Sequence, residues 1–281
     1  MHPANFDYHR ASSIDEAESL WRENSEASFL AGGHSLIPAM KLRLSDPGTL
    51  VDISDIDDLK GITRDGDTIR IGSLTTHAEV EKSDVVKDGC SVLSEAAGMI
   101  GDPQVRNRGT IGGNVAHADP ASDYPGILMA LGATIVTSNR SIAVDDFFTG
   151  LFETALNDGE VITEVQVPAI GVGSGAAYTK FFNPSSRYAV VGVGALVSKS
   201  DGSCSSCRIG VTGAADHAFR ASVAEENLQG SDLGDDAVAA SAAKVSDGQE
   251  MLSDLSASAD YRTHLCSVMA RRAIAEAVSR A

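Results

Sequence analysis

The order of apolar and polar positions predicts a small strand–helix–strand unit at the start of the chain. Ser13 and Glu16 have the spacing of a capping box, which predicts a short helix through Trp21. An apolar run then leads into a double glycine, and a further helix and strand follow. The predicted elements after the first helix are a strand over 28–31, a helix over 36–44 and a strand over 49–53.

The pattern then predicts two larger units. The second would contain strands over 68–71, 133–137 and 160–167, helices over 85–100 and 124–131, and a glycine-rich loop over 101–121. A glycine-rich hinge over 171–175 precedes three predicted strands and an alanine-rich helical tail. Those last elements are strands over 176–182, 189–198 and 204–212, and a final helix over 259–278. The domains are therefore predicted at 1–55, 56–170 and 171–281.

Composition narrows the classes of function. A length of 281 residues suffices for several cores, whereas a net charge of −17 argues against nucleic-acid partners and anionic membrane surfaces. No apolar run approaches the ~20 residues of a membrane helix. The first residues lack a basic stretch followed by an apolar block, so a cytoplasmic location is expected.

The remaining reactive side chains predict neither a metal site nor a nucleophile. His34 has no Cys or Ser nucleophile beside it, and the pair His117 and Asp119 lacks a third ligand. Cys204 and Cys207 form a C-x-x-C, but strand-like alternation follows instead of a helix start. We therefore predict no catalytic residue, no metal ligand and two unconnected thiols near a hairpin.

Two glycine-rich segments are the informative motifs. The first is Ala31-Gly32-Gly33-His34-Ser35, directly after a strand, and the second is Thr110-Ile111-Gly112-Gly113-Asn114. Paired glycines permit positive φ and leave no Cβ in the way of a ligand, so backbone N–H groups can converge on an anion. Each segment alone could equally be a tight turn. Two of them together suit a diphosphate.

The commonest nucleotide-binding patterns are absent from both segments. Neither ends in the Gly-Lys-Ser/Thr of a P-loop. The nearest imitation of a Rossmann fingerprint, Gly192-Val193-Gly194, lacks the third glycine and is better interpreted as strand.

The joint pattern resembles a known family. Residues 29–43 closely resemble the first FAD motif of medium subunits of carbon monoxide dehydrogenases, and 104–114 resemble the second. The match continues through 119–123 and Lys180, and covers essentially the whole chain. It implies an α+β fold: a two-part FAD-binding domain of the vanillyl-alcohol-oxidase (PCMH) type, then a small C-terminal domain of a three-stranded antiparallel sheet plus helices.

The resemblance also implies which residues contact the cofactor. Both glycine segments would hold the FAD diphosphate, Asp123 would contact FAD, and Lys180 would lie near the flavin, where it could stabilise negative charge on the reduced ring. Ile100 and Tyr188 would pack near the cofactor, although helix-end packing and a strand start explain them equally simply. The full set is Leu30, Ala31, Gly32, Gly33, His34, Ser35, Leu36, Ile100, Thr110, Ile111, Gly112, Gly113, Asn114, Asp123, Ile162, Lys180 and Tyr188.

The function implied by the resemblance is electron transfer within a larger complex. A small subunit would carry two 2Fe–2S clusters and a large subunit the molybdenum–pterin centre, in a dimer of heterotrimers. This chain has too few clustered cysteines to ligate such clusters itself. The alternatives are a stand-alone FAD-dependent oxidase of the vanillyl-alcohol type and a nucleotide-binding regulatory module.

Overall fold

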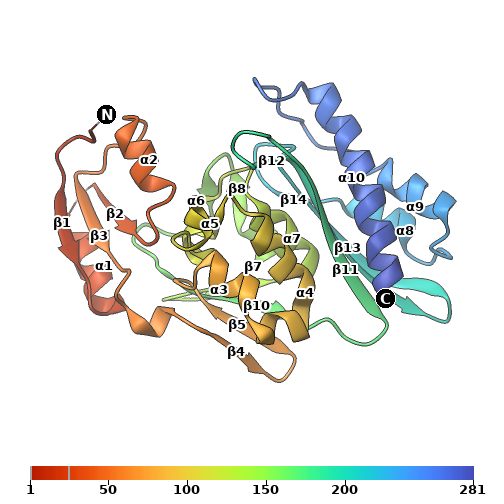
Figure 1. The fold of residues 1–281 in the computed structure, drawn as a ribbon, viewed down its shortest axis with the longest axis horizontal. Coiled ribbons are helices and arrows are strands. Elements are labelled where there is room, and N and C mark those ends of the chain that lie inside the picture. The colour runs from red at the N-terminus through yellow and green to blue at the C-terminus, as the bar shows by residue number, and fades with distance from the viewer. Residues whose placement is uncertain (1, 25) are drawn as a thin grey trace.

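The N-terminal unit is built around a small parallel sheet. The computed structural model describes residues 2–24 and 26–281, and Figure 1 shows this unit in red and orange at one end of the molecule. Its strands are ordered β1-β3-β2, and its elements are β1 (Asp7–Arg10), α1 (Ile14–Glu23), β2 (Ala27–Leu30), α2 (Leu36–Lys41) and β3 (Thr49–Asp52). Strand β1 was not predicted, because its four residues are all exposed and show no apolar alternation.

Helix α1 begins at the predicted position with Ser13 as its N-cap, but the capping box is incomplete. The Ser13 hydroxyl accepts a hydrogen bond from the N–H of Glu16. The Glu16 carboxylate, however, accepts from the backbone and hydroxyl of Ser12, so the reciprocal capping box is not formed. A complete capping box occurs instead between Thr76 and Glu79, at the start of α3.

The middle unit surrounds an antiparallel sheet ordered β4-β5-β10-β6-β7. The strands of this sheet are β4 (Ile62–Asp65), β5 (Thr68–Gly72), β6 (Thr134–Thr137), β7 (Ser141–Ala143) and β10 (Ile162–Pro168), and β8 (Phe148–Gly150) and β9 (Glu153–Thr154) form a separate pair in the same unit. Its helices are η1 (Asp57–Leu59), α3 (His77–Lys82), α4 (Asp84–Met99), α5 (Pro103–Arg106), α6 (Ile111–His117), α7 (Asp123–Leu131) and η2 (Val144–Asp146). Helices α4 and α7 lie between this sheet and the C-terminal sheet (Figure 1).

Two predictions for the middle unit were wrong. The segment 101–121 is not one loop, because α5 and α6 form within it. The predicted helix over 85–100 is interrupted at Cys90, which has a φ of −157° and a buried side chain.

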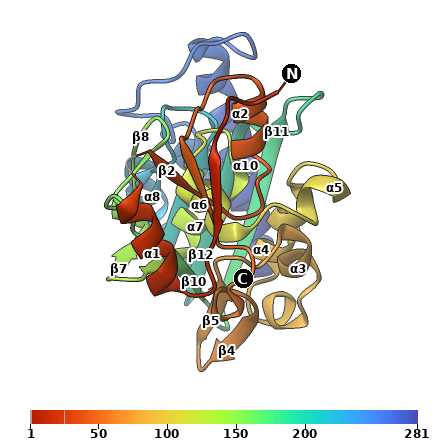
Figure 2. The same ribbon diagram turned by 90° about the vertical axis from the view of Figure 1, so that its left-hand side faces the viewer.

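The C-terminal unit is an antiparallel sheet covered by helices. Its strands are β11 (Ser174–Phe182), β12 (Ala189–Ser200), β13 (Ser203–Thr212) and β14 (Phe219–Arg220), and its helices are α8 (Ser222–Leu228), α9 (Asp235–Ala242) and α10 (Ala259–Arg280). The two-residue β14 is a fourth strand beyond the three predicted. Figure 2 shows the same units from the N-terminal side, with α10 behind the sheets.

Glycines on the C-terminal sheet allow α7 to pack closely against it. A Cβ at Gly210 would overlap the carbonyl oxygen of Gly126 in α7, and one at Gly194 would lie 3.0 Å from the Ile127 side chain. Segment 192–194 is therefore part of strand β12, as predicted, and its glycines serve packing.

Each unit has its own apolar core. The largest core joins the five-stranded sheet to α4 and α7, a second lies beneath α10, and a small third lies in the N-terminal unit. Among the helices of the described residues, none is both long and apolar enough to cross a membrane.

Candidate functional site

A cavity of about 510 Å³ brings the predicted site residues together. Its wall combines α1, β2 and the first glycine segment of the N-terminal unit with α6 and β10 of the middle unit. The segment 186–188 of the C-terminal unit completes it. Every residue of the predicted set lines the cavity except Ile111, which is fully buried, and Lys180. Residues remote in sequence therefore surround one cavity.

The first glycine segment follows β2 directly and ends in α2. Gly33 has a φ of +72°, a conformation that L side chains rarely adopt. No backbone N–H from Gly32 to Leu36 donates a hydrogen bond to any other part of the described chain. Since these residues line the cavity, the segment offers consecutive unused donors to an anionic ligand.

The second glycine segment is the first turn of helix α6, with Thr110 as the N-cap. Its backbone N–H groups already have acceptors within the protein. Ile111 donates to the Thr75 carbonyl at 3.0 Å, Gly112 to the Ser73 carbonyl at 2.8 Å, and Gly113 to the Thr110 hydroxyl at 3.2 Å. The Asn114 side chain is also engaged, because its carbonyl oxygen accepts from the Ser122 hydroxyl at 2.6 Å.

The two glycine segments meet at Gly32. A Cβ on Gly32 would overlap the carbonyl oxygen of Arg108, which lies just before the second segment. The absence of a side chain at Gly32 therefore lets the N-terminal and middle units approach until both line one cavity.

The cavity is also lined by Ile100, Asp123 and Tyr188. Ile100 is the C-cap of α4 and Asp123 is the first residue of α7. Burial raises the pKa of Tyr188, as does the negative charge of Asp119, while the nearby Ser35 hydroxyl lowers it. Tyr188 of the C-terminal unit therefore lies beside the first glycine segment.

Two histidines lie where the glycine segments meet. His34 places Nδ1 3.3 Å from the Gly32 carbonyl oxygen. His77, which the sequence analysis did not select, is 3% exposed and packs edge-on against Tyr124. Burial lowers the pKa of His77 to about 4, with nearby His34 and Arg106 contributing, so His77 is neutral at pH 7.

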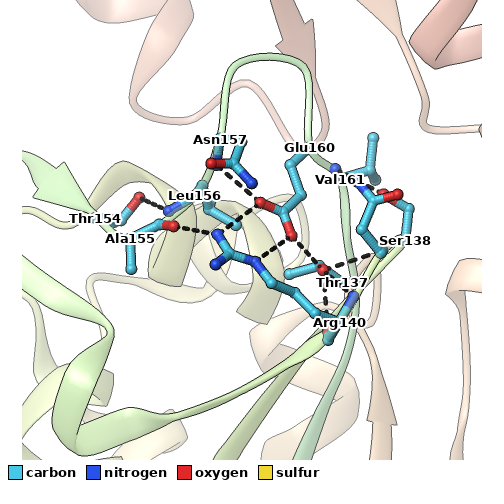
Figure 3. A network of polar contacts seen from close by, with 10 residues as sticks. Thr137, Ser138, Arg140, Thr154, Ala155, Leu156, Asn157, Glu160 and Val161 are labelled. Atoms are coloured by element: carbon cyan, nitrogen blue, oxygen red, sulfur yellow. Dashed lines mark hydrogen bonds and ion pairs between the residues drawn. The ribbon is translucent and has the colours of Figure 1, made fainter.

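The buried carboxylate of Glu160 holds together the part of the cavity wall formed by residues 154–162. Only Ile162 of this region was predicted as a site residue. Glu160 has no exposed side-chain surface and pairs with Arg140 at 3.0 Å (Figure 3). The N–H of Asn157 and the Thr137 hydroxyl also donate to it. Burial would raise the pKa of Glu160, but these donors outweigh it and bring the pKa to about 2.

The Glu160 network joins the 137–140 turn to the segment that carries Leu156, Val161 and Ile162 in the cavity wall (Figure 3). In sequence, Arg140 and Glu160 are merely two charged residues separated by twenty positions. The missed wall residues are mostly apolar. Trp21, Ile53, Leu74 and Leu156 belong to no motif, whereas Phe29 and Val105 lie in the two motif stretches but were not selected.

The chemistry of this wall fits FAD. A cavity with free backbone donors in its wall suits a diphosphate, and apolar lining residues such as Trp21, Phe29 and Ile100 suit flat rings. All four cysteines are free, and Cys204 and Cys207 lie on β13, as predicted, away from the cavity wall.

Comparisons with known proteins match the chain to one family over nearly its whole length. Residues 4–170 match the model of the FAD binding domain in molybdopterin dehydrogenase, and residues 176–277 match the CO dehydrogenase flavoprotein C-terminal domain. The chain is 39% identical to the carbon monoxide dehydrogenase medium chain of Hydrogenophaga pseudoflava, over 100% of this chain and 99% of that one. It is 37% identical to the glyceraldehyde dehydrogenase medium chain of Sulfolobus acidocaldarius, over 98% and 99%.

A solved structure is similar over the same extent. A chain of carbon monoxide dehydrogenase from Hydrogenophaga pseudoflava superposes with a TM-score of 0.97 at 41% identity, covering 100% of this chain and 99% of that chain.

Proposed function

The chain belongs to the family of FAD-binding medium subunits of carbon monoxide dehydrogenases and related molybdenum hydroxylases, and on this premise we propose that it relays electrons from partner 2Fe–2S clusters to an external acceptor. Family and fold class agree with the prediction from sequence. Bound FAD would supply the electron-carrying centre that the side chains of this chain lack.

The observation that carries the proposal is the cavity formed by two remote glycine segments. The first segment would bind the diphosphate through the free N–H groups of Gly32 to Leu36. The second segment would contribute the hydroxyl of Thr110 and the amide of Asn114 beside it. The Ile100 and Tyr188 side chains would exclude water from the flavin ring.

The assembly and the domain boundaries are part of the same proposal. The relatives named as medium chains imply a large molybdenum-cofactor subunit and a small iron–sulfur subunit. We propose that they assemble here as a dimer of heterotrimers in the cytoplasm. The domain boundaries would be 1–55, 56–170 and 171–281, since each range contains one of the three main sheets.

The stand-alone oxidase is not favoured. The C-terminal unit, where an oxidase of the vanillyl-alcohol type would carry its substrate domain, matches the flavoprotein C-terminal domain of CO dehydrogenase.

The test compares the purified chain with the complex co-expressed with its neighbouring subunits. The chain alone should bind one FAD, show flavin absorption and remain oxidised when the substrate of the complex is added. In the complex, substrate should bleach the flavin absorption. A chain that takes up no FAD, or one whose flavin is reduced by an alcohol without partners, contradicts the proposal.

A further inference from the structure

Lys180 lies behind the cavity wall and uses all its hydrogen-bond donors within the protein. It is in β11, and its side chain is 4% exposed. Nζ lies 2.9 and 3.1 Å from the two carboxylate oxygens of Asp123, 3.0 Å from the Met99 carbonyl and 2.8 Å from the Arg187 carbonyl. An ammonium group has three N–H donors, and here three acceptor groups take them.

Each of these three acceptors belongs to a segment that also forms the cavity wall. Met99 precedes Ile100, and Arg187 precedes Tyr188, while Asp123 lines the cavity itself. The three segments come from the end of α4, the start of α7 and the 183–188 loop. One ammonium group therefore fixes three pieces of chain that are remote in sequence in one part of the cavity wall.

The C-terminal sheet is shaped to support this arrangement. The Tyr178 hydroxyl, two residues before Lys180, donates to Asp123 at 2.7 Å. It fits only because Gly192 on the neighbouring strand has no side chain, since a Cβ there would overlap the Tyr178 hydroxyl oxygen. Asp123 is thus held by two side chains of β11, and both of its carboxylate oxygens are occupied.

We propose that Lys180 is a positioning residue, which holds Ile100, Asp123 and Tyr188 in the cavity wall and makes no bond of its own to the cofactor. This inference rests on the proposed function, namely that the cavity binds FAD. It differs from the expectation drawn from the family resemblance, in which Lys180 stabilises charge on the reduced flavin. A lysine with all three donors committed acts through the segments that it holds.

The test is a double-mutant cycle on FAD affinity in the full chain, with Lys180→Met, Tyr188→Leu and the double variant. FAD dissociation constants are measured well below the melting temperature of each variant. Lys180→Met should weaken binding at least about tenfold, because the 183–188 loop loses its anchor. Tyr188→Leu should then weaken binding far less in the Lys180→Met background than in the wild type, because Tyr188 is already displaced.

The matched control is Lys199→Met. Lys199 is a partly buried lysine of the same sheet that donates to the Val278 carbonyl, and it lies outside the cavity wall. We expect its FAD affinity to stay within about twofold of the wild type, since it bonds no segment of the cavity. If Lys199→Met weakened FAD binding as much as Lys180→Met does, the loss would reflect a general effect of sheet stability. That result would overturn the inference.

A further pair of variants separates anchoring from the cost of an unpaired charge. Lys180→Met leaves the buried Asp123 carboxylate without its partner, which can prevent folding. The cycle is then repeated in the Asp123→Asn background. There Lys180→Met leaves no unpaired carboxylate, while Lys180 itself keeps its carbonyl acceptors on Met99 and Arg187. The same non-additivity is expected.

The possible outcomes distinguish the inference from the function on which it rests. Additive effects of the Lys180 and Tyr188 changes, with normal FAD binding by the wild type, overturn the inference alone. A wild-type chain that does not bind FAD overturns the inference and the proposed function together.

Discussion

The segments Gly32–Leu36 and Thr110–Asn114 look alike in sequence, with paired glycines beside hydroxyl side chains, yet the fold uses their backbones differently. The N–H groups of the first segment have no acceptor in the described chain, whereas Ile111, Gly112 and Gly113 in the second all donate within the protein. The first segment follows an edge strand of a small sheet. The second is the first turn of a helix packed on the strand end at Ser73.

A glycine pair in a cavity wall can therefore either leave backbone donors free for a ligand or allow the surrounding elements to pack closely. Gly33 permits a backbone conformation that leaves donors free. Gly112 permits close packing, since a Cβ there would overlap the Cβ of Ser73. Substitutions in the two segments should therefore separate ligand affinity from fold stability.

The largest effect is expected for Gly112→Val. The added side chain would collide with the backbone and Cβ of Ser73, and neither can move without displacing β5 and α6. We expect a loss of about 4 kcal/mol in the free energy of unfolding, at the upper end of overpacking effects. Urea denaturation of the apo chain measures it, and a loss below about 1 kcal/mol would contradict the scaffold role.

Protonation of His77, whose ring lies where the two glycine segments meet, should give the next largest loss in the free energy of unfolding. Its pKa falls from 6.5 in the unfolded chain to about 4 in the folded one. Between these values the unfolded state binds more protons, so stability is lost as the pH falls from about 6.5 to 4 and changes no further below that. The loss should total about 3 kcal/mol. Comparing the pH dependence of unfolding with that of His77→Gln isolates this contribution.

Gly33→Val should affect the ligand more than the fold. A valine at a φ of +72° is strained by about 1–2 kcal/mol, and its Cβ would lie 2.8 Å from the flexible end of Ile37. Reorientation of the free N–H groups should weaken FAD binding by at least about tenfold, the equivalent of one lost charge-assisted hydrogen bond. Flavin content after gel filtration and the dissociation constant are the measurements. Unchanged affinity would place the diphosphate elsewhere.

The smallest effect is expected for Gly113→Ala. The new Cβ would lie 2.8 Å from Oγ of Thr110, so that hydroxyl must rotate away from its N-cap bond. Loss of one cap costs about 1 kcal/mol. Thermal unfolding of this variant beside Gly112→Val tests whether the scaffold role belongs to Gly112 specifically; equal losses in both would remove the distinction.

The sequence predicted what depends on local pattern. Strands β11, β12 and β13 are stretches of strand-forming residues bounded by turn signals such as Asp201-Gly202, and they were placed nearly to the residue. Strand β1 has no such pattern, since Asp7 to Arg10 are exposed and pair only with β3. Helix α6 (Ile111–His117) was missed because two glycines, which have a low helix propensity, lie in its first turn. The start of this helix is stabilised by tertiary hydrogen bonds to the carbonyls of Ser73 and Thr75.

The site residues that belong to a contiguous sequence motif were predicted. Those that the fold brings to the cavity from separate parts of the sequence were missed. The glycine segments are contiguous in sequence and line the cavity as a group. Glu160 and Arg140 are brought together by the antiparallel pairing of β6 with β10. His77 is held at the cavity by its N–H, which donates to the carbonyl of Gly109, more than thirty residues later in the sequence. The spacing of these residues in the sequence does not indicate that they pair.

Trp21, which packs against Gly159 in the cavity wall, is the only tryptophan of the chain. Flavins absorb light where indole emits it, so a flavin ring system within the cavity should quench Trp21 fluorescence by energy transfer. Trp21 fluorescence should therefore report the fraction of the protein that has FAD bound. A titration followed by Trp21 emission alone would yield a binding isotherm without label or separation step.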